Sequence, residues 1–161
     1  MIRPDSALAT RCIHAGEIDD PHGSPHTPLY TTTTFKFAST AAILDVVEGR
    51  KAGALYTRYG LNPTIRALEE KLAAIEGAEA ALAFCSGMAA ESALFLAQGR
   101  QGVVCLGDAY GGTLELLAAQ LPALGIPTRF LLGHELDALP ALLEAGVGLV
   151  FFETPTNPML E

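Results

Sequence analysis

The sequence predicts an α/β fold, a mostly parallel sheet with flanking helices. From residue 79 onward, short apolar runs alternate with stretches of helical pattern. The predicted strands are 80–84, 103–106, 128–132 and 147–152, and the predicted helices between them are 88–96, 113–121 and 136–143. Strand, helix and strand at this spacing form right-handed crossovers, which make neighbouring strands parallel. The strands are continuously apolar, which is typical of a sheet covered by helices on both faces.

Residues 1–60 predict an extended arm with one short helix. In the segment 1–37, helices of useful length are excluded by four prolines: Pro4, Pro21, Pro25 and Pro28. The short helix is expected to begin at Ser39 or Thr40 and to end at Gly49. Such an arm cannot bury a core of its own, so it lies either on the domain that follows or on a neighbouring subunit.

A stronger helical pattern opens the domain 61–161. Asn62 is a good N-cap, Pro63 is tolerated at the first helical position, and Gly77 ends the pattern. One face carries an apolar stripe that is typical of a helix turned toward a core: Ile65, Leu68, Leu72 and Ile75.

Composition excludes several classes of protein. The 161 residues are 50% hydrophobic and 17% charged, so the chain has enough apolar surface to fold. The net charge of −8 and the lack of a Lys/Arg run exclude a surface for duplex nucleic acid. The spacing of Cys12, Cys85 and Cys105 fits neither a disulfide framework nor a metal pair, which indicates buried thiols in a reducing compartment. Without a signal-peptide core or a run of 18 apolar residues, the sequence predicts a cytoplasmic protein that does not contact membranes.

The candidate site lies beyond the carboxyl ends of the predicted strands, where open α/β sheets bind ligands. Three polar segments emerge there: 85–88, 108–112 and 153–158. In the first, Ser86 and Gly87 lead directly into a helix, so the backbone N–H groups of Gly87 and Met88 are free to bind a phosphate. The alternative is a turn of small residues chosen for tight packing of helix on sheet.

The other two segments carry an aromatic ring and an amide. Tyr110 can lay its ring on a flat ligand and keep its hydroxyl for proton transfer, or it can pack at the sheet edge. Asn157 stands between two prolines that fix its backbone, which suits either the orientation of a ligand oxygen or a simple Asn-Pro turn. Glu153, at a buried strand end, needs an arginine or a backbone amide as partner.

Several other sites are excluded by their missing motifs. The chain has no GxGxxG after a strand, no phosphate-binding GxxxxGK[ST] loop and no GxSxG elbow, which argues against a nucleotide-binding domain or a serine hydrolase. His22 and His26 stand near Asp19 and Asp20, but in a Gly/Pro loop without helical preorganisation. No metal site is therefore predicted.

Seven motifs in order along the chain resemble the Cys/Met-metabolism family of pyridoxal-phosphate enzymes, which includes cystathionine γ-synthase, cystathionine γ-lyase, methionine γ-lyase and O-acetylhomoserine sulfhydrylase. The motifs are 13–16 (IHAG), 28–30 (PLY) with its threonine run, 56–58 (YTR), 62–64 (NPT), 86–90 (SGMAA), 108–113 (DAYGGT) and 153–158 (ETPTNP). The resemblance implies that residues 61–161 form the first part of an aspartate-aminotransferase-like, type I cofactor domain. It also implies pyridoxal 5′-phosphate as cofactor, trans-sulfuration of an amino-acid substrate, and a homodimer or homotetramer with shared sites.

The same resemblance implies roles for single residues. Ser86, Gly87 and Met88 would bind the cofactor phosphate, and Tyr110 would stack on the pyridine ring and move protons as a catalytic residue. Asn157 would contact the cofactor's phenolic oxygen or the substrate carboxylate. Two further residues would reach the phosphate in a neighbouring subunit: Tyr56 and Arg58.

Three features qualify the resemblance. Between Arg58 and Asn62 stand three residues where the family usually has two, and Gly60 is expected to absorb the extra one as a bulge. Gly112 stands where the methionine-cleaving branch tends to carry cysteine, which favours a cystathionine-forming or cystathionine-cleaving member over a methionine γ-lyase, with the sulfhydrylase still open.

The third feature concerns the lysine that holds the cofactor aldehyde as an imine. None of the chain's lysines matches that position: Lys36, Lys51 and Lys71. The carboxylate that pairs with the pyridine nitrogen is missing as well. Taken as it stands, the chain is expected not to turn over substrate, so a truncated, catalytically inactive binding domain is the rival interpretation.

Overall fold

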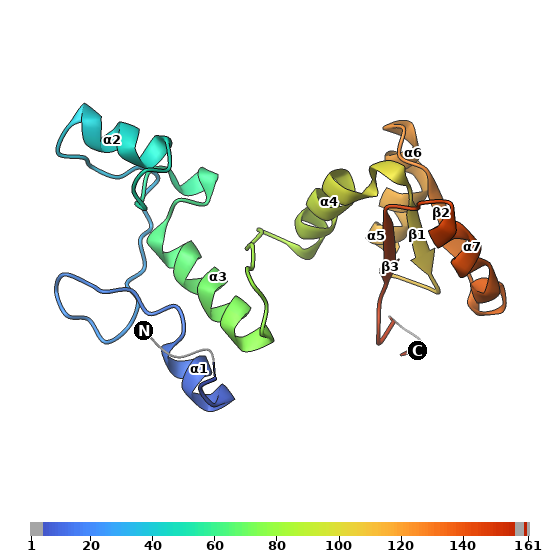
Figure 1. The fold of residues 1–161 in the computed structure, drawn as a ribbon, viewed down its shortest axis with the longest axis horizontal. Helices are drawn as coiled ribbons and strands as arrows, with labels where there is room; N and C mark the ends of the chain where they lie inside the picture. The colour runs from blue at the N-terminus through green and yellow to red at the C-terminus, as the bar shows by residue number, and fades with distance from the viewer. Residues whose placement is uncertain (1–4, 157–159, 161) are drawn as a thin grey trace. The chain divides into compact units, whose positions relative to one another are not determined.

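The computed structural model describes residues 5–156 and 160, which form two compact units. Unit 1 runs up to Ala83 and unit 2 starts at Phe84 (Figure 1). We describe each unit by itself. The division that the sequence suggests at residue 60, between arm and domain, stays a prediction.

Helix caps define the helices of unit 1. They are α1 (Leu8–His14), α2 (Thr40–Val47), the 3-10 turn η1 (Thr57–Tyr59) and α3 (Pro63–Glu76). The Ser39 hydroxyl accepts the backbone N–H of Ala42 at the start of α2. The Asn62 side chain accepts that of Thr64 at the start of α3, and Gly77 ends α3 in the left-handed region at φ 67°. These caps and both predicted helices are confirmed.

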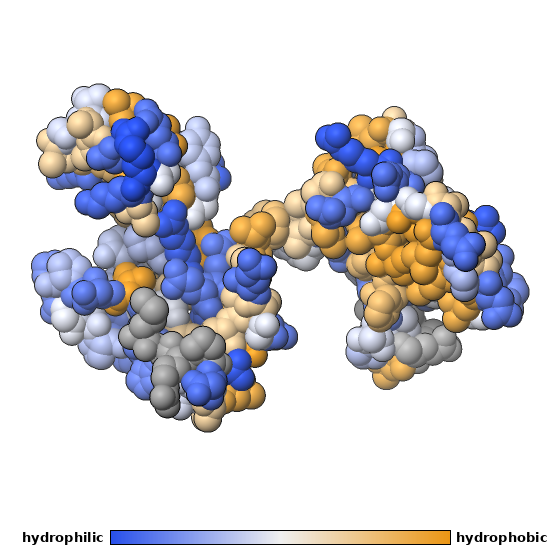
Figure 2. Space-filling view, in the orientation of Figure 1, coloured by the Kyte–Doolittle hydropathy of each residue, from blue (hydrophilic) through white to orange (hydrophobic). Residues whose placement is uncertain are grey.

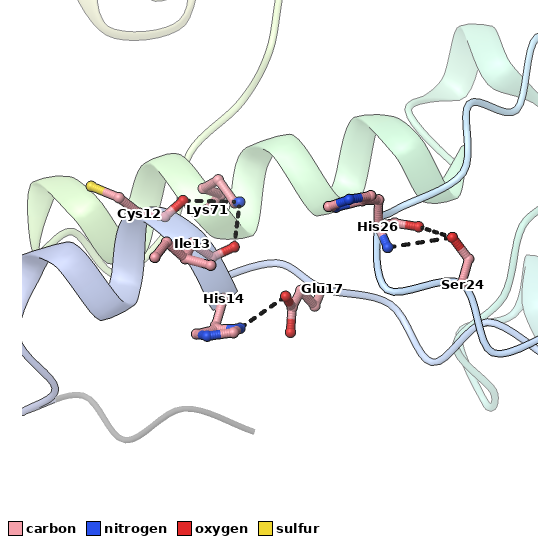
Figure 3. Close-up of polar contacts among 7 residues, drawn as sticks. All are labelled: Cys12, Ile13, His14, Glu17, Ser24, His26 and Lys71. Carbon is pink, nitrogen blue, oxygen red and sulfur yellow. Dashed lines mark hydrogen bonds and ion pairs between the residues drawn. The ribbon is translucent and has the colours of Figure 1, made fainter.

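Helix α1 overturns the prediction that the proline-rich arm holds no helix. Proline restricts itself and the residue before it, and the stretch between Pro4 and Pro21 is long enough for two helical turns. Polar contacts tie α1 to α3. Arg11 donates through an Nη atom to the carbonyl of Ala74 at 2.6 Å. Lys71 donates through Nζ to the carbonyls of Cys12 (3.1 Å) and Ile13 (3.0 Å), as Figure 3 shows. Each cation therefore lies at the carboxyl end of the other helix, where the helix dipole favours positive charge.

Packing on α3 differs from the predicted apolar stripe. Leu68 and Leu72 are 48% and 41% exposed, whereas the buried residues of α3 are Ala67 and Ala73. Gly16, which follows α1 with φ 69°, explains this difference, because a Cβ atom there would overlap the carbonyl oxygen of Ala67. Because the α3 residue at this contact is the small Ala67, the backbone of the arm can pack closely against the helix.

The Asn62 side chain connects the arm, the turn η1 and the start of α3. It is buried, donates to the carbonyl of Tyr30 (2.8 Å) and to the hydroxyl of Thr57 (3.0 Å), and accepts the Thr64 N–H (2.9 Å). The Thr64 hydroxyl in turn accepts the N–H of Tyr30 and donates to the carbonyl of Pro28, both at 2.9 Å. The segment 28–34 of the arm therefore lies against the start of α3 in its own chain.

Unit 2 contains a parallel sheet with helical connections. In chain order it has α4 (Gly87–Gln98), η2 (Gly99–Gln101), β1 (Val103–Leu106), α5 (Gly111–Glu115), the π-helical turn η3 (Leu116–Gln120), α6 (Leu121–Ala123), β2 (Thr128–Leu131), η4 (Gly133–Ala138), α7 (Leu139–Glu144) and β3 (Leu149–Phe152). The strands are ordered β2-β1-β3, and Val103 is in register with Thr128 on one side and Leu149 on the other. The predicted fold class is confirmed.

The core of unit 2 surrounds the central strand. Val103 and Cys105 of β1 are 1% exposed and pack with Phe95, Leu117 and Leu121 from the helices. The ring of Phe95 also meets that of Phe151 edge to face, with centroids 5.2 Å apart. These contacts fix α4 and the α5–η3–α6 helical run against the sheet, which places both helix starts near the carboxyl end of β1.

Two strand predictions fail in the structure. Residues 80–84 form no strand among the described residues. Leu82 is 76% exposed, and the N–H of Ala83 donates to a carboxylate oxygen of Glu69 at 2.9 Å instead of to a neighbouring strand. Strand β3 begins at Leu149, two residues later than predicted, because the N–H of Val147 still donates to Leu142 of α7 and that of Gly148 donates to Gly102 before β1.

Strand β3 lies at one edge of this sheet and carries apolar side chains. Phe152 is 59% exposed, and Leu149, Val150 and Phe151 are half-buried. Figure 2 shows apolar residues gathered over the sheet on the visible face of unit 2. In the described parts of the chain, no helix is long and apolar enough to cross a bilayer.

Candidate functional site

The start of α4 has the features of an anion-binding turn. Ser86 is extended, and its hydroxyl accepts the N–H of Ala89 at 3.1 Å, so the helix begins at Gly87 as the sequence indicates. No described residue accepts the N–H groups of Gly87 or Met88. A Cβ atom on Gly87 would meet nothing within 4 Å, so the described chain leaves open space beside this residue. Free N–H groups and the positive end of a 12-residue helix attract an anion there.

Tyr110 follows β1 and caps α5. Its backbone N–H donates to a carboxylate oxygen of Glu153, just after β3, at 3.0 Å. This contact confirms that Glu153 takes a backbone amide as its partner. The N–H of Ala109 donates to Asp108 at 2.9 Å, and the Ala109 side chain is buried. The backbone of the turn is thus fixed, whereas the Tyr110 side chain is 55% exposed and available to a ligand.

Gly112 lies between the Tyr110 ring and Met88 at the start of α4. A Cβ atom on Gly112 would lie 2.7 Å from Cε1 of Tyr110 and 3.3 Å from Sδ of Met88. The Thr113 hydroxyl lies 3.8 Å from the same sulfur atom. The start of α4 and the Tyr110 ring are therefore neighbours at the carboxyl edge of the sheet, which is the juxtaposition that the topology predicts.

Tyr56 and Arg58 belong to unit 1. The Arg58 guanidinium lies over the Tyr56 ring, 4.7 Å from its centroid, and donates to the Tyr56 hydroxyl. The Tyr59 ring is 5.0 Å from that of Tyr56 between centroids. Gly60 adopts φ 74° and caps the turn η1, so α3 still starts directly after Asn62. Asn157, the remaining predicted cofactor residue, lies outside the described residues.

Sequence reasoning missed Glu91 and Thr113. Thr113 is fully buried, and its hydroxyl donates to a carboxylate oxygen of Glu91 at 2.6 Å. The two residues are separated by a strand and a loop, so no local pattern links them. Glu91 is the single charged residue of the helix 88–96, and this is the one signal that could have drawn attention to it.

The histidines of unit 1 make simple surface contacts. Nδ1 of His14 lies 3.0 Å from a carboxylate oxygen of Glu17, and Ser24 donates to the carbonyl of His26 (Figure 3). Asp20 accepts the N–H groups of His22 and Ser24 and so closes a turn. Within the described residues, no three His, Cys, Asp or Glu side chains gather in a way that could hold a metal ion.

The three cysteines are free thiols in different environments. Cys12 and Cys85 are exposed, contrary to the prediction that all three are buried, while Cys105 is buried in β1. Burial, followed by the negative charges of Glu153 and Asp108, raises the pKa of the Cys105 thiol from 9.0 to about 11.

We expect the raised pKa of Cys105 to make stability fall in alkaline solution. The folded chain holds this proton more tightly than the unfolded chain, so the stabilisation is complete below pH 9 and is lost as the pH rises toward 11. The urea midpoint of unit 2 should fall more steeply between these pH values in the wild type than in Cys105→Ala. Equal slopes for the two proteins would contradict the assignment, whatever the absolute loss from the alanine cavity.

The fold and site define a parallel α/β protein with an anion-binding helix start beside an exposed tyrosine. The sequence profile of the Cys/Met metabolism PLP-dependent enzymes matches residues 9–161, so the chain belongs to that family. It is 38% identical over 162 residues to cystathionine gamma-lyase of Saccharomyces cerevisiae, covering 99% of this chain and 39% of that protein. It is 40% identical over 158 residues to cystathionine gamma-synthase of Mycobacterium tuberculosis, covering 96% and 39%.

The solved structures agree with this membership. The crystal structure of cystathionine gamma-lyase from yeast superposes with a TM-score of 0.81 at 36% identity, over 100% of this chain and 39% of that one. The chain thus spans about two fifths of the length of these relatives.

Proposed function

We propose that this chain forms part of the cofactor site of a trans-sulfuration enzyme that uses pyridoxal 5′-phosphate, of the cystathionine γ-synthase or γ-lyase type. The observation that carries the proposal is the pair of free N–H groups at Gly87 and Met88 beside the exposed Tyr110. A dianionic phosphate on a flat aromatic ring matches this pair of features.

The residues present fit this cofactor. Open space in front of Gly87 leaves room for a phosphate, which Ser86, Gly87 and Met88 would hold. The Tyr110 ring would lie on the pyridine, and its hydroxyl would accept or return a proton at the substrate carbon chain. Asn157 would orient an oxygen of cofactor or substrate. When bound, the cofactor supplies an electron sink that stabilises negative charge at the substrate Cα.

A second subunit would complete the site. The Arg58 guanidinium lies over the Tyr56 ring and contacts its hydroxyl, so the two side chains form one exposed cluster. A charged planar fork suits a phosphate. We propose that these two residues reach the cofactor phosphate of a neighbouring copy, in a homodimer or homotetramer. The exposed free thiols of Cys12 and Cys85 fit a reducing compartment such as the cytoplasm.

Gly112 favours the cystathionine-type members. Any side chain at this position would press on Tyr110 and Met88, so a cysteine would require the tyrosine ring to move. The alternatives within the family are an O-acetylhomoserine sulfhydrylase and a methionine γ-lyase.

A domain that binds the phosphate ligand without turnover is the second candidate. Lys71 is occupied by two carbonyls of α1, and Lys36 and Lys51 are exposed residues of unit 1. The intact mass of the natural protein separates the candidates, because the 161-residue chain alone has a mass of 16.9 kDa. A longer natural protein with a borohydride-trapped lysine adduct supports the enzyme.

The phosphate site can be tested by deleting one N–H group. Proline is tolerated at the first helical position and requires the extended conformation that Ser86 already has, so Gly87→Pro removes the donor and keeps the helix. We expect Gly87→Pro to weaken pyridoxal-phosphate binding about tenfold, since a hydrogen bond to a charged group is lost. The matched control Gly87→Ala retains the N–H.

Titration followed by cofactor absorbance measures both variants. Gly87→Ala should bind within about threefold of the wild type, because a hydrogen bond to the charged group is retained. Pyridoxal, which lacks the phosphate, should bind weakly to all three proteins. Equal binding of pyridoxal and pyridoxal phosphate by the wild type, or equal losses in the two variants, would refute the phosphate site.

A further inference from the structure

A buried polar pair connects the two helices that flank the candidate site. The hydroxyl of Thr113, in the first turn of α5, donates to Glu91 of α4 at 2.6 Å. Thr113 is 0% exposed and Glu91 is half-buried. A short hydrogen bond to a carboxylate is strong, and the loss of Glu91 would leave the buried hydroxyl of Thr113 without this acceptor.

The pair lies directly behind the groups that face the ligand. Met88 and Glu91 are three residues apart on α4, so they share one helix face. The Met88 sulfur lies 3.8 Å from the same Thr113 hydroxyl. On α5, Thr113 is three residues from Tyr110, whose carbonyl accepts the N–H of Leu114 at 3.0 Å. The contact between Glu91 and Thr113 thus sets how close the start of α4 comes to the Tyr110 turn.

A second carboxylate holds the same turn from another element. Glu153 accepts the Tyr110 N–H from beyond β3. The Tyr110 turn is therefore anchored to the sheet by Glu153 and to α4 by Glu91. Of these two anchors, the one at Glu91 joins the turn to the helix that carries the free N–H groups.

We propose that Glu91 is a positioning residue that acts through Thr113 to hold the Tyr110 ring in register with the start of α4. The inference rests on the proposed function, because it assigns Tyr110 and the α4 N–H groups to one ligand. A ligand that touches both elements depends on the pair, whereas a ligand that needs only the start of α4 does not.

The experiment uses the 161-residue chain and four single variants. Thr113→Val and Glu91→Ala break the contact, whereas Thr113→Ser and Glu91→Gln retain a hydroxyl donor and an oxygen acceptor. Pyridoxal phosphate and inorganic phosphate are the two probes. We expect the breaking variants to weaken pyridoxal-phosphate binding about tenfold and to change inorganic-phosphate binding less than about twofold. The conservative variants should stay near the wild type.

Hydrogen exchange provides a readout that does not need the cofactor. The N–H groups of Tyr110 and Leu114 should exchange about tenfold faster in Thr113→Val than in Thr113→Ser, while that of Cys105 in β1 stays protected. If the wild type binds no pyridoxal phosphate, the proposed function fails and the exchange result still decides the role of the pair. Unchanged exchange at Tyr110 in Thr113→Val overturns the inference.

The double variant Glu91→Leu/Thr113→Val guards against simple misfolding. Replacement of both partners by apolar groups leaves no buried polar group unsatisfied, so this protein should fold. It should nevertheless show the weakened pyridoxal-phosphate binding of the single variants. If it binds pyridoxal phosphate like the wild type, or if both probes lose affinity in parallel, the pair serves stability and not position.

Discussion

Gly16→Ala should destabilise unit 1 by about 3 kcal/mol or more, the largest effect expected from a single methyl group in this chain. Gly16 has φ 69°, which costs an alanine about 1 kcal/mol by itself. The added carbon would also overlap the carbonyl oxygen of Ala67 and lie 3.0 Å from the nitrogen of Lys71, both in the backbone of α3. A backbone cannot move aside as a side chain can, so α1 must separate from α3.

Gly23→Ala is the matched control for this prediction. Gly23 has nearly the same φ, 73°, and a Cβ atom there would meet nothing within 4 Å. It should lose only the conformational term, about 1 kcal/mol. The urea midpoint, read from the amide NMR signals of α3, measures both variants. Equal losses would show that the close approach of Gly16 to α3 contributes nothing to stability.

Asn62→Asp should cost about 3 kcal/mol, although the substitution exchanges a single NH2 group for oxygen. The carboxylate can still cap α3 through the N–H of Thr64. It cannot donate to the carbonyl of Tyr30, which then faces a buried negative charge at the position of the present 2.8 Å hydrogen bond. The arm should therefore detach from α3 while the helix itself persists.

Ser39→Ala is the control that separates the loss of a helix cap from the loss of the bridge between the arm and α3. The Ser39 side chain caps α2 through the N–H of Ala42 and makes no other hydrogen bond to the described residues, so its loss should cost about 1 kcal/mol. Hydrogen exchange at Tyr30 and Thr57, whose N–H groups bond to Thr64 and Thr33, reports the detachment of the arm. Protection of these two amides in Asn62→Asp equal to that in the wild type would contradict the bridging role of Asn62.

The parts of the fold that the sequence predicts well are those decided by neighbours in the chain. Ser39 and Asn62 cap their helices because a short polar side chain reaches N–H groups two or three residues ahead. Strand β1 has its predicted bounds, and its continuously apolar residues are buried at the centre of the sheet. The juxtaposition of Met88 and Tyr110 follows from the order of the elements, since α4 leads into the amino end of β1 and α5 starts beyond its carboxyl end.

The failed predictions depend on contacts between distant segments. Residues 80–84 have the composition of a strand, but a strand also needs a partner with which to share hydrogen bonds. The apolar stripe of α3 gives way to Ala67 because Gly16, fifty residues earlier in the chain, approaches that face. For the same reason the contact between Glu91 and Thr113 could not be foreseen, because nothing local pairs a helical glutamate with a threonine beyond the next strand.

Strand β3 has a consequence for how the protein behaves when it is made and concentrated. It is an outer strand with an exposed phenylalanine, and within the described chain its far side has no neighbour. The unpaired N–H and C=O groups of such an edge strand can form hydrogen bonds with the backbone of another extended peptide. Exposed backbone groups along this strand therefore favour association of the molecule with other copies of itself at high concentration.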